Sequence, residues 1–451
     1  MTSNSMNIGF VSRVCIVAAL GGLLFGFDTA IISGAIPFIQ SYFNLNAVWL
    51  GWAVSCVLIG CAVGAMVAGK LADIFGRRFM LITCALLFAV SGIGAGLAGN
   101  LWTFISYRML GGLGVGAAAM VSPMYIAEIA PAAIRGRMVA LYQLAIVSGI
   151  LLAYGAGYAF ADIVPNNWRW MFASQALPAL LFFIPLCFVP ETPRWLVGKN
   201  KISRAKAVLG KISGIYSIDA EIHLIQSSFE SGNQGTFSEI FRRPYAKVLF
   251  CGIMIAVFQQ VCGVNAILYY APTIFKATGL GHADALFQTI LMGAVNVLAT
   301  IIAIVYVDKI GRKTFLITGS LLMGLCLVVV ATCFHFNYFG HYVVLIATLA
   351  YVATFACTLG AVTWVYLSEI FPNRIRGMAL SIATLALWLA DFVVSYTFPV
   401  MTGGLGTPLT LTCYTVCCFL AFFFMYRLPE TKGRTLETME IIFINQKNNR
   451  V

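Results

Sequence analysis

Charged residues are scarce in this chain of 451 residues: Asp, Glu, Lys and Arg make up 10% of it, whereas hydrophobic residues make up 61%. A soluble domain of this size needs more polar surface, so that class of protein is excluded. Histidine is also rare, with 4 residues, and no two of the 13 cysteines form a C-x-x-C pair. We therefore expect small, buried, reduced cysteines, no metal site, and no membrane-embedded enzyme.

Twelve apolar stretches take the place of that polar surface. Each is about 18–25 residues long, enough to cross about 30 Å of hydrocarbon as a helix. They are centred near residues 25, 60, 88, 114, 149, 180, 259, 297, 325, 355, 388 and 418. The sequence therefore predicts an all-α membrane protein with twelve transmembrane helices. The first stretch is too long for a cleavable signal peptide and lacks a small-residue cleavage site.

The basic residues predict an orientation. Of the 28 Lys and Arg residues, all but Arg108, Arg169 and Lys276 are assigned to one face of the membrane. The positive-inside rule makes that face cytoplasmic, and it places both termini there, in a multi-pass protein of the cell membrane. The net charge of +12 then reflects topology and attraction to an anionic leaflet. No base-reading motif accompanies it, so we expect no nucleic-acid partner.

The chain repeats itself. DIFGRR at 73–78 recurs as DKIGRK at 308–313, EIAPAAIRG at 128–136 recurs as EIFPNRIRG at 369–377, and PET at 190–192 recurs at 429–431. The order is the same both times, which predicts two six-helix halves related by a pseudo-two-fold axis along the membrane normal. We expect one bundle at 1–190, a cytoplasmic linker with short helices at 191–246, and a second bundle with a short tail at 247–451.

The repeated motifs bring acids and bases to the cytoplasmic face. Their glycine permits a tight turn between two helices, and their bases keep the loop inside. We expect these groups to latch the two halves together and release them; the alternative is solvated ion pairs worth under about 1 kcal/mol each. The residues are Asp73, Arg77, Arg78, Glu128, Arg135 and Glu191 in the first half, and Asp308, Arg312, Glu369, Arg376 and Glu430 in the second.

Asp28 lies in the middle of an uncharged apolar run, VCIVAALGGLLFGFDTAIISGAIPFI. A carboxylate near the bilayer centre costs about 2.5–3.5 kcal/mol even on a lenient scale. Arg108 is taken here as the only other charge so deep in such a run. At 1.5 Å per residue, both would lie about 9–10 Å below the outer surface, so the two charges can meet. The pair is either a structural salt bridge or a protonatable switch in a transporter.

Several motifs together resemble the sugar porter branch of the major facilitator superfamily over residues 12–440. They are GGLLFGFDTAIISG (21–34), GRR (76–78), SPMYIAEIAPAAIRGR (122–137), PETPRW (190–195), QQVCGVNAILYYAP (259–272), DKIGRK (308–313), SEIFPNRIRG (368–377) and PETKG (429–433). The resemblance is greatest to bacterial xylose–proton symporters. It implies the major facilitator fold and import of a xylose-like monosaccharide, pentose or hexose, by alternating access, with the proton as coupling ion, no other cofactor, and a monomer.

Two alternatives stay open. One is a passive uniporter of the same fold, although the passive animal relatives generally have a neutral residue at the position of Asp28. The other is a membrane sugar sensor, although those usually carry a long cytoplasmic tail. The resemblance implies that Asp28 carries the proton and that Arg108 tunes its affinity.

The resemblance also implies a sugar site near the membrane midplane, between the two halves. Amide side chains offer donors and an acceptor to sugar hydroxyls, and a helix break at Gly263 would bring Gln259 and Asn265 together. Alternatively, the amides only bond neighbouring helices. The candidates are Phe25, Gln143, Gln259, Gln260, Asn265, Tyr269, Asn296, Trp364 and Trp388, with Tyr270 beside Tyr269 at the outer end. Ile150 and Leu387 stand where the family pattern has Gln, so the sugar's identity stays open.

Overall fold

The computed structural model describes residues 7–163, 165–212, 218–230, 239–242, 245–372 and 374–433. All regular structure within these ranges is helical. Twelve of its spans are long and apolar enough to cross a membrane. The predicted helical class and the predicted number of spans are therefore confirmed.

Nine of these spans are single helices. They are α1 (Ile8–Tyr42), α2 (Ala47–Phe75), α3 (Arg77–Gly96), α4 (Leu101–Ile129), α5 (Ala132–Phe160), α13 (His282–Ile310), α14 (Arg312–His335), α17 (Arg376–Gly404) and α18 (Thr407–Tyr426). Their apolar sequences form helices because a backbone inside a membrane must satisfy its own hydrogen bonds.

The other three spans are each interrupted. The sixth consists of α6 (Asn167–Ala173) and α7 (Ala176–Leu186), and the seventh of α11 (Tyr245–Val261) and α12 (Val264–Lys276). The tenth consists of α15 (Val343–Phe355), a π-helical turn (Ala356–Gly360) and α16 (Ala361–Ile370). Such interruptions free backbone groups and are common at functional sites.

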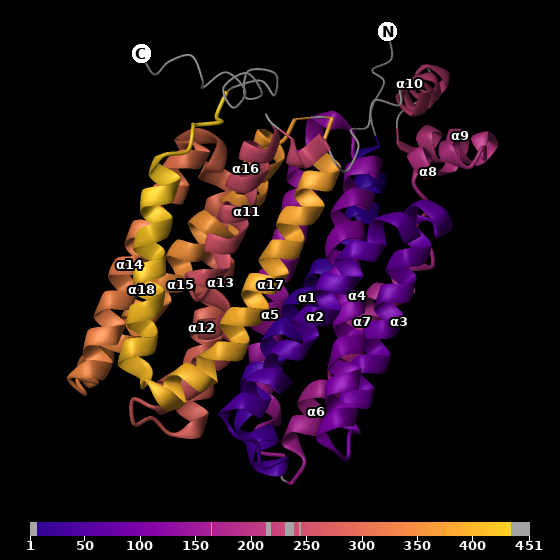
Figure 1. Cartoon of the computed structure of the whole chain (residues 1–451). Helices are drawn as coiled ribbons and strands as arrows, with labels where there is room; N and C mark the ends of the chain where they lie inside the picture. Colours follow the sequence, from indigo (N-terminus) through magenta and orange to yellow (C-terminus); the bar gives the residue numbers. More distant parts are fainter. Residues whose placement is uncertain are drawn as a thin grey trace, which may run out of the picture. The chain divides into compact units, whose positions relative to one another are not determined.

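The chain groups into two compact units by its contacts. Unit 1 comprises Met1–Asp28, Gly60–Gly149 and Phe172–Asn233, and unit 2 comprises Thr29–Ile59, Ile150–Met171 and Gln234–Val451. The helices α1, α2, α5 and α6 therefore contribute to both. In unit 1, α3 packs along α4 and α7 (Figure 1). In unit 2, α14 packs along α15 and α18, and α11 packs along α17 (Figure 1).

The predicted linker helices are present in unit 1. They are α9 (Ile202–Ile212) and α10 (Ile218–Glu230), preceded by the short α8 (Pro193–Gly198), which the sequence analysis did not predict. Lys206 on α9 forms an ion pair of 2.7 Å with Asp219 on α10. Because this ion pair is largely exposed, it adds little stability. A short 3₁₀ turn, η2 (Glu239–Phe241), precedes α11, and another, η3 (Gly340–Tyr342), precedes α15.

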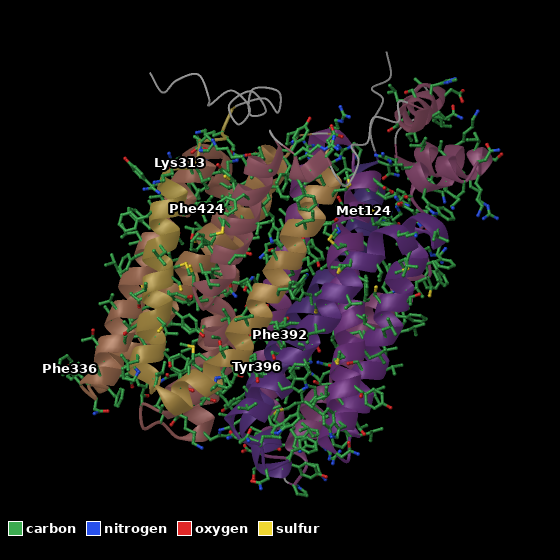
Figure 2. All side chains as sticks on the ribbon, in the orientation of Figure 1. Met124, Lys313, Phe336, Phe392, Tyr396 and Phe424 are labelled. Atoms are coloured by element: carbon green, nitrogen blue, oxygen red, sulfur yellow. The ribbon has the colours of Figure 1, made fainter. Side chains whose placement is uncertain are left out.

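Residues that are far apart in the sequence pack together in unit 2. Trp52 on α2 packs edge-on against Phe392 of α17, with ring centroids 5.8 Å apart. Phe392 and Tyr396 stack one turn apart on the same helix (Figure 2). Lys313 and Phe336 mark the two ends of α14 (Figure 2). We call the end of unit 2 that carries Lys313 its basic end. The end of unit 1 that carries Arg78 is likewise called the basic end of unit 1.

Candidate functional site

The two deep charges of unit 1 are in direct contact, as predicted. Asp28 on α1 accepts a hydrogen bond of 2.6 Å from Nη1 of Arg108 on α4. Each residue is only 1% exposed. An ion pair removed from water to this degree is costly to assemble, and removing one member leaves an uncompensated charge.

A third polar residue completes this cluster. Nε2 of Gln175 donates a 2.8 Å hydrogen bond to the same carboxylate oxygen of Asp28. Gln175 lies at the break between α6 and α7, and the guanidinium of Arg108 lies 5.4 Å from the ring centroid of Phe172. Gln175 was not predicted from the sequence. One clue was available: an amide in the otherwise apolar segment MFASQALPAL.

The cluster is only partly satisfied. Among the residues that the structure describes, Nε and Nη2 of Arg108 and the side-chain oxygen of Gln175 have no hydrogen-bond partner. A purely structural pair in low dielectric is stable when its remaining donors are satisfied. One oxygen of the Asp28 carboxylate therefore accepts two hydrogen bonds, and the guanidinium of Arg108 beside it keeps unused donors.

Three of the predicted sugar-binding residues, the amides Gln259, Gln260 and Asn265, lie around the break in the seventh span, within unit 2. Gly263 has φ +92°, and Val264 starts α12 directly after it, so the predicted break is confirmed. Nδ2 of Asn265 donates a 2.9 Å hydrogen bond back to the side-chain oxygen of Gln260. Nε2 of Gln259 donates a 3.0 Å bond to the backbone oxygen of Leu359, in the π-helical turn. Each amide thus bonds a neighbour, and each also keeps further donor or acceptor capacity.

The aromatic candidates of unit 2 differ in exposure. Trp388 and Tyr269 are buried, whereas Trp364 is 38% exposed. The hydroxyl of Tyr270 donates a 3.1 Å bond to the backbone oxygen of Ser395, which fixes α12 against α17. Asn296 on α13 is buried.

The remaining positions fall on both units. Gln143 and Phe25 are half-buried in unit 1, and their sugar-binding role stays a prediction. Ile150 and Leu387 are both buried in unit 2.

The expectation that Arg108 was the only other deep charge is wrong. Asp391 lies near the middle of α17 and is 2% exposed. Its carboxylate accepts a 3.0 Å hydrogen bond from the hydroxyl of Ser395, and it also interacts with the amide of Asn265. The pattern WLADFVV places this acid in an apolar run, three residues after Trp388, but Asp391 was not predicted as a deep charge.

At the basic end of unit 1, Glu191 caps the start of α3. Its carboxylate accepts 3.1 Å hydrogen bonds from the backbone N–H groups of Arg77 and Arg78. Gly76 precedes them with φ +105°, and a Cβ there would collide with this carboxylate. The predicted glycine turn is thus confirmed, and the carboxylate sits where a helix N-terminus favours negative charge. Burial raises the pKa of Glu191, and hydrogen bonds from Thr192, Arg78 and Arg77 partly offset that rise.

A second acid in unit 1, Glu128, binds the side chain of Arg77. Arg77 forms ion pairs of 3.1 Å with Glu128 and 2.9 Å with Asp73. The other oxygen of Glu128 accepts a 2.6 Å bond from the hydroxyl of Thr192. Arg78 instead donates to backbone oxygens at the end of α7.

Unit 2 repeats this arrangement. Glu430 accepts 3.1 Å bonds from the backbone N–H groups of Arg312 and Lys313. Arg312 pairs with Glu369 at 3.0 Å, and Glu369 accepts a 2.6 Å bond from the hydroxyl of Thr431. The preceding glycine, Gly311, has φ +107°. The sequence repeat is therefore a repeat of geometry.

The remaining latch candidates lie on the same loops. Arg135 and Arg376 each donate to a backbone oxygen five residues earlier, at 3.2 Å. The side chain of Asp308 lies outside the part of the chain whose side chains are described. The interactions given above for the latch candidates join residues of one unit, and a latch between the halves stays a prediction.

All thirteen cysteines are free. Most are buried or half-buried, but Cys187 and Cys413 are exposed, which differs from the expectation of uniform burial.

Comparison with known proteins identifies the family. A family model described as "Sugar (and other) transporter" matches residues 14–443. The chain is 40% identical over 476 residues to the D-xylose-proton symporter of Escherichia coli K12, covering 97% of this chain and 96% of that protein. It is 38% identical over 449 residues to the arabinose-proton symporter of Bacillus subtilis, covering 98% and 97%.

Solved structures agree with this relationship. The inward open conformation of the xylose transporter XylE from E. coli matches with a TM-score of 0.85 and 40% identity, over 96% of this chain and 99% of that one. The twelve spans have the major facilitator fold of that transporter. The chain belongs to the sugar transporter family whose model it matches over almost its whole length.

Proposed function

We propose that this protein is a sugar–proton symporter that imports a pentose or hexose by alternating access across the cell membrane. Asp28 carries the coupled proton, and Arg108 sets how readily it is released. Both termini face the cytoplasm, because the positive loops do. The protein works as a monomer, with the proton as its coupling ion and no other cofactor.

The observation that supports coupling is the cluster of Asp28, Arg108 and Gln175. A buried carboxylate with one arginine bond at 2.6 Å is neutralised by a single proton. Arg108 has unused donors ready for another partner when that proton arrives. Protonation thus exchanges an ion pair for a neutral acid beside a cation, which changes the packing of α1 against α4. Moving one charge across the membrane supplies about 2.3 kcal/mol per 100 mV.

The sugar site is proposed on the broken seventh span of unit 2. Gln259, Gln260 and Asn265 come together there because Gly263 ends one helix and starts the next. Their spare donors and acceptors suit vicinal hydroxyls, and neutral amides need no counter-ion. Buried Trp388 supplies an apolar face for the sugar's C–H groups.

Arabinose and xylose are both candidate substrates. Relatives named for arabinose and for xylose are almost equally identical to this chain. Leu387 and Ile150 remove amides that would otherwise bond hydroxyls, and such losses change which analogue is rejected. Both pentoses, and glucose, therefore belong in the assay.

The test is uptake of radiolabelled sugar by proteoliposomes with and without an imposed pH gradient. The wild-type protein should accumulate sugar above the external concentration only with the gradient. Asp28→Asn should lose accumulation but keep equilibrium exchange, because the site keeps its shape without the titratable group. Accumulation by Asp28→Asn at the wild-type level would remove Asp28 from the mechanism. Exchange without accumulation in the wild type would identify a passive uniporter.

A further inference from the structure

Asp391 is a buried carboxylate that the proposed mechanism does not use. It lies near the middle of α17 and is 2% exposed. At helical spacing it shares a face with Leu387, one turn before it, and with Ser395, one turn after it. This face of α17 therefore carries an acid between an apolar and a hydroxyl side chain.

Asp391 belongs to a continuous chain of polar side chains. The hydroxyl of Ser395 donates to its Oδ1 at 3.0 Å, and the amide of Asn265 interacts with the carboxylate. Nδ2 of Asn265 also donates to the side-chain oxygen of Gln260 at 2.9 Å. The carboxylate is therefore linked through one amide to the proposed sugar site, within unit 2.

The surroundings of Asp391 differ from those of Asp28. Among the described residues, no Lys, Arg or His forms an ion pair with it. On the helices that pack against α17, the buried titratable side chains are phenols and a thiol: Tyr269 and Tyr270 on α12, Tyr366 on α16, and Tyr414 and Cys418 on α18. The charged residues of these helices, Lys247, Lys276 and Glu369, lie in their terminal turns and are not buried. From α2 the facing side chain at this level is Trp52, against Phe392.

An ionised acid is expensive in such a place. A charged side chain at the centre of a membrane helix loses the solvation that water would give it. Two neutral donors, the hydroxyl of Ser395 and the amide of Asn265, favour the ionised form by binding to it. Burial thus favours the protonated form and the two donors favour the ionised form, so this carboxyl group has environments that act in both directions. Asp28, by contrast, has a full countercharge at 2.6 Å.

We propose that Asp391 is a second proton-binding site of this transporter, and that its protonation raises the affinity for sugar through Asn265. This inference rests on the proposed sugar site. An ionised Asp391 only accepts hydrogen bonds, so it competes with Gln260 and with sugar for the amide N–H groups of Asn265. A protonated Asp391 also donates, and it frees those N–H groups for a hydroxyl.

The experiment measures sugar binding to purified full-length protein, by calorimetry, in sodium-free buffer at about pH 5.5 and about pH 8.5. D-xylose and L-arabinose are the probes. The background is Asp28→Asn, which removes the first proton site. In this background we expect sugar to bind at least about threefold more tightly at the lower pH; linkage to one proton allows up to about tenfold per pH unit.

The decisive comparison is with the double variant. Asp28→Asn/Asp391→Asn should bind sugar with the same affinity at both pH values. The matched control is Asp28→Asn/Asp284→Asn, which removes an exposed acid at the start of α13 and should keep the pH dependence. Ser395→Ala in the Asp28→Asn background removes one donor from the carboxylate, so the midpoint of the pH dependence should move to higher pH.

Different results would overturn the role of Asp391 and the proposed function. A pH dependence that survives Asp391→Asn, or affinities of Asp28→Asn that do not vary with pH, would overturn the assignment of Asp391. If wild-type proteoliposomes still accumulated sugar, the proposed function would stand in either case. If neither pentose nor glucose bound to the wild type at any pH, the proposed function and this inference would both be overturned.

Discussion

Replacing Arg108 by leucine is the perturbation that separates a switch from a structural salt bridge. The bond from Nη1 to Asp28 is 2.6 Å long and both residues are 1% exposed, so the substitution leaves a carboxylate without its cation. Breaking a buried pair in this way costs about 3–5 kcal/mol. Protonation of Asp28 avoids most of that cost. We therefore expect Asp28 to stay protonated at physiological pH, and active accumulation to be lost.

The double variant sharpens this prediction. Asp28→Asn alone leaves Arg108 with Gln175, whose free side-chain oxygen can turn towards it, and with the ring of Phe172. Asp28→Asn/Arg108→Leu removes both charges, so its expression and melting temperature should exceed those of Asp28→Asn. Coupling energies between contacting residues are about 0.5–3 kcal/mol, so the effects should not add. Accumulation should stay absent in the double variant.

The assay is the pH profile of uptake in proteoliposomes, with Arg108→Lys as the control that keeps the charge. Wild-type uptake should depend on external pH, and Arg108→Leu should lose that dependence together with accumulation. An unaltered profile with intact accumulation in Arg108→Leu would refute the coupling of the two charges. The pair would then be a structural salt bridge.

Further predictions concern the sugar site and the basic end of unit 1. Gln260→Ala removes the acceptor of Asn265 and amide bonds to sugar, each worth about 0.5–1.5 kcal/mol, so affinity in the calorimeter should fall several-fold; unchanged affinity would place the site elsewhere. Gly76→Ala puts a Cβ at a positive φ and against the carboxylate of Glu191, so the melting temperature should fall by several degrees; an unchanged value would show that the turn adapts. Because burial raises the pKa of Glu191, its carboxyl group adds stability at low pH that is lost as pH rises through the raised pKa. As pH rises above about 4.3, the melting temperature of the wild type should therefore fall more steeply than that of Glu191→Gln. Equal slopes of melting temperature against pH in the two proteins would contradict this.

Much of the fold follows from the sequence because the membrane leaves few alternatives. Apolar stretches of sufficient length must be helices, and the twelve predicted spans are all present. The turn at Gly76 and the break at Gly263 were predictable because both positions have a positive φ that suits glycine.

The rotation of each helix is what the sequence does not determine. Helix α4 is apolar on every side, so periodicity cannot say which face Arg108 shares with which neighbour. Its contact with Asp28 was predicted from depth and opposite charge, but Gln175, 147 residues away from Asp28, was not. Asp391 was visible in the sequence and was missed, because no countercharge stood out as its partner.

The central claim is that sugar and proton cross together, and the most direct test is sugar-driven proton movement. Proteoliposomes with a pH dye inside, no gradient and a permeant counter-ion receive external xylose or arabinose. We predict that the wild-type protein acidifies the lumen when sugar is added, and that Asp28→Asn exchanges sugar without any acidification. Sugar entry through the wild type with no change in internal pH would contradict it.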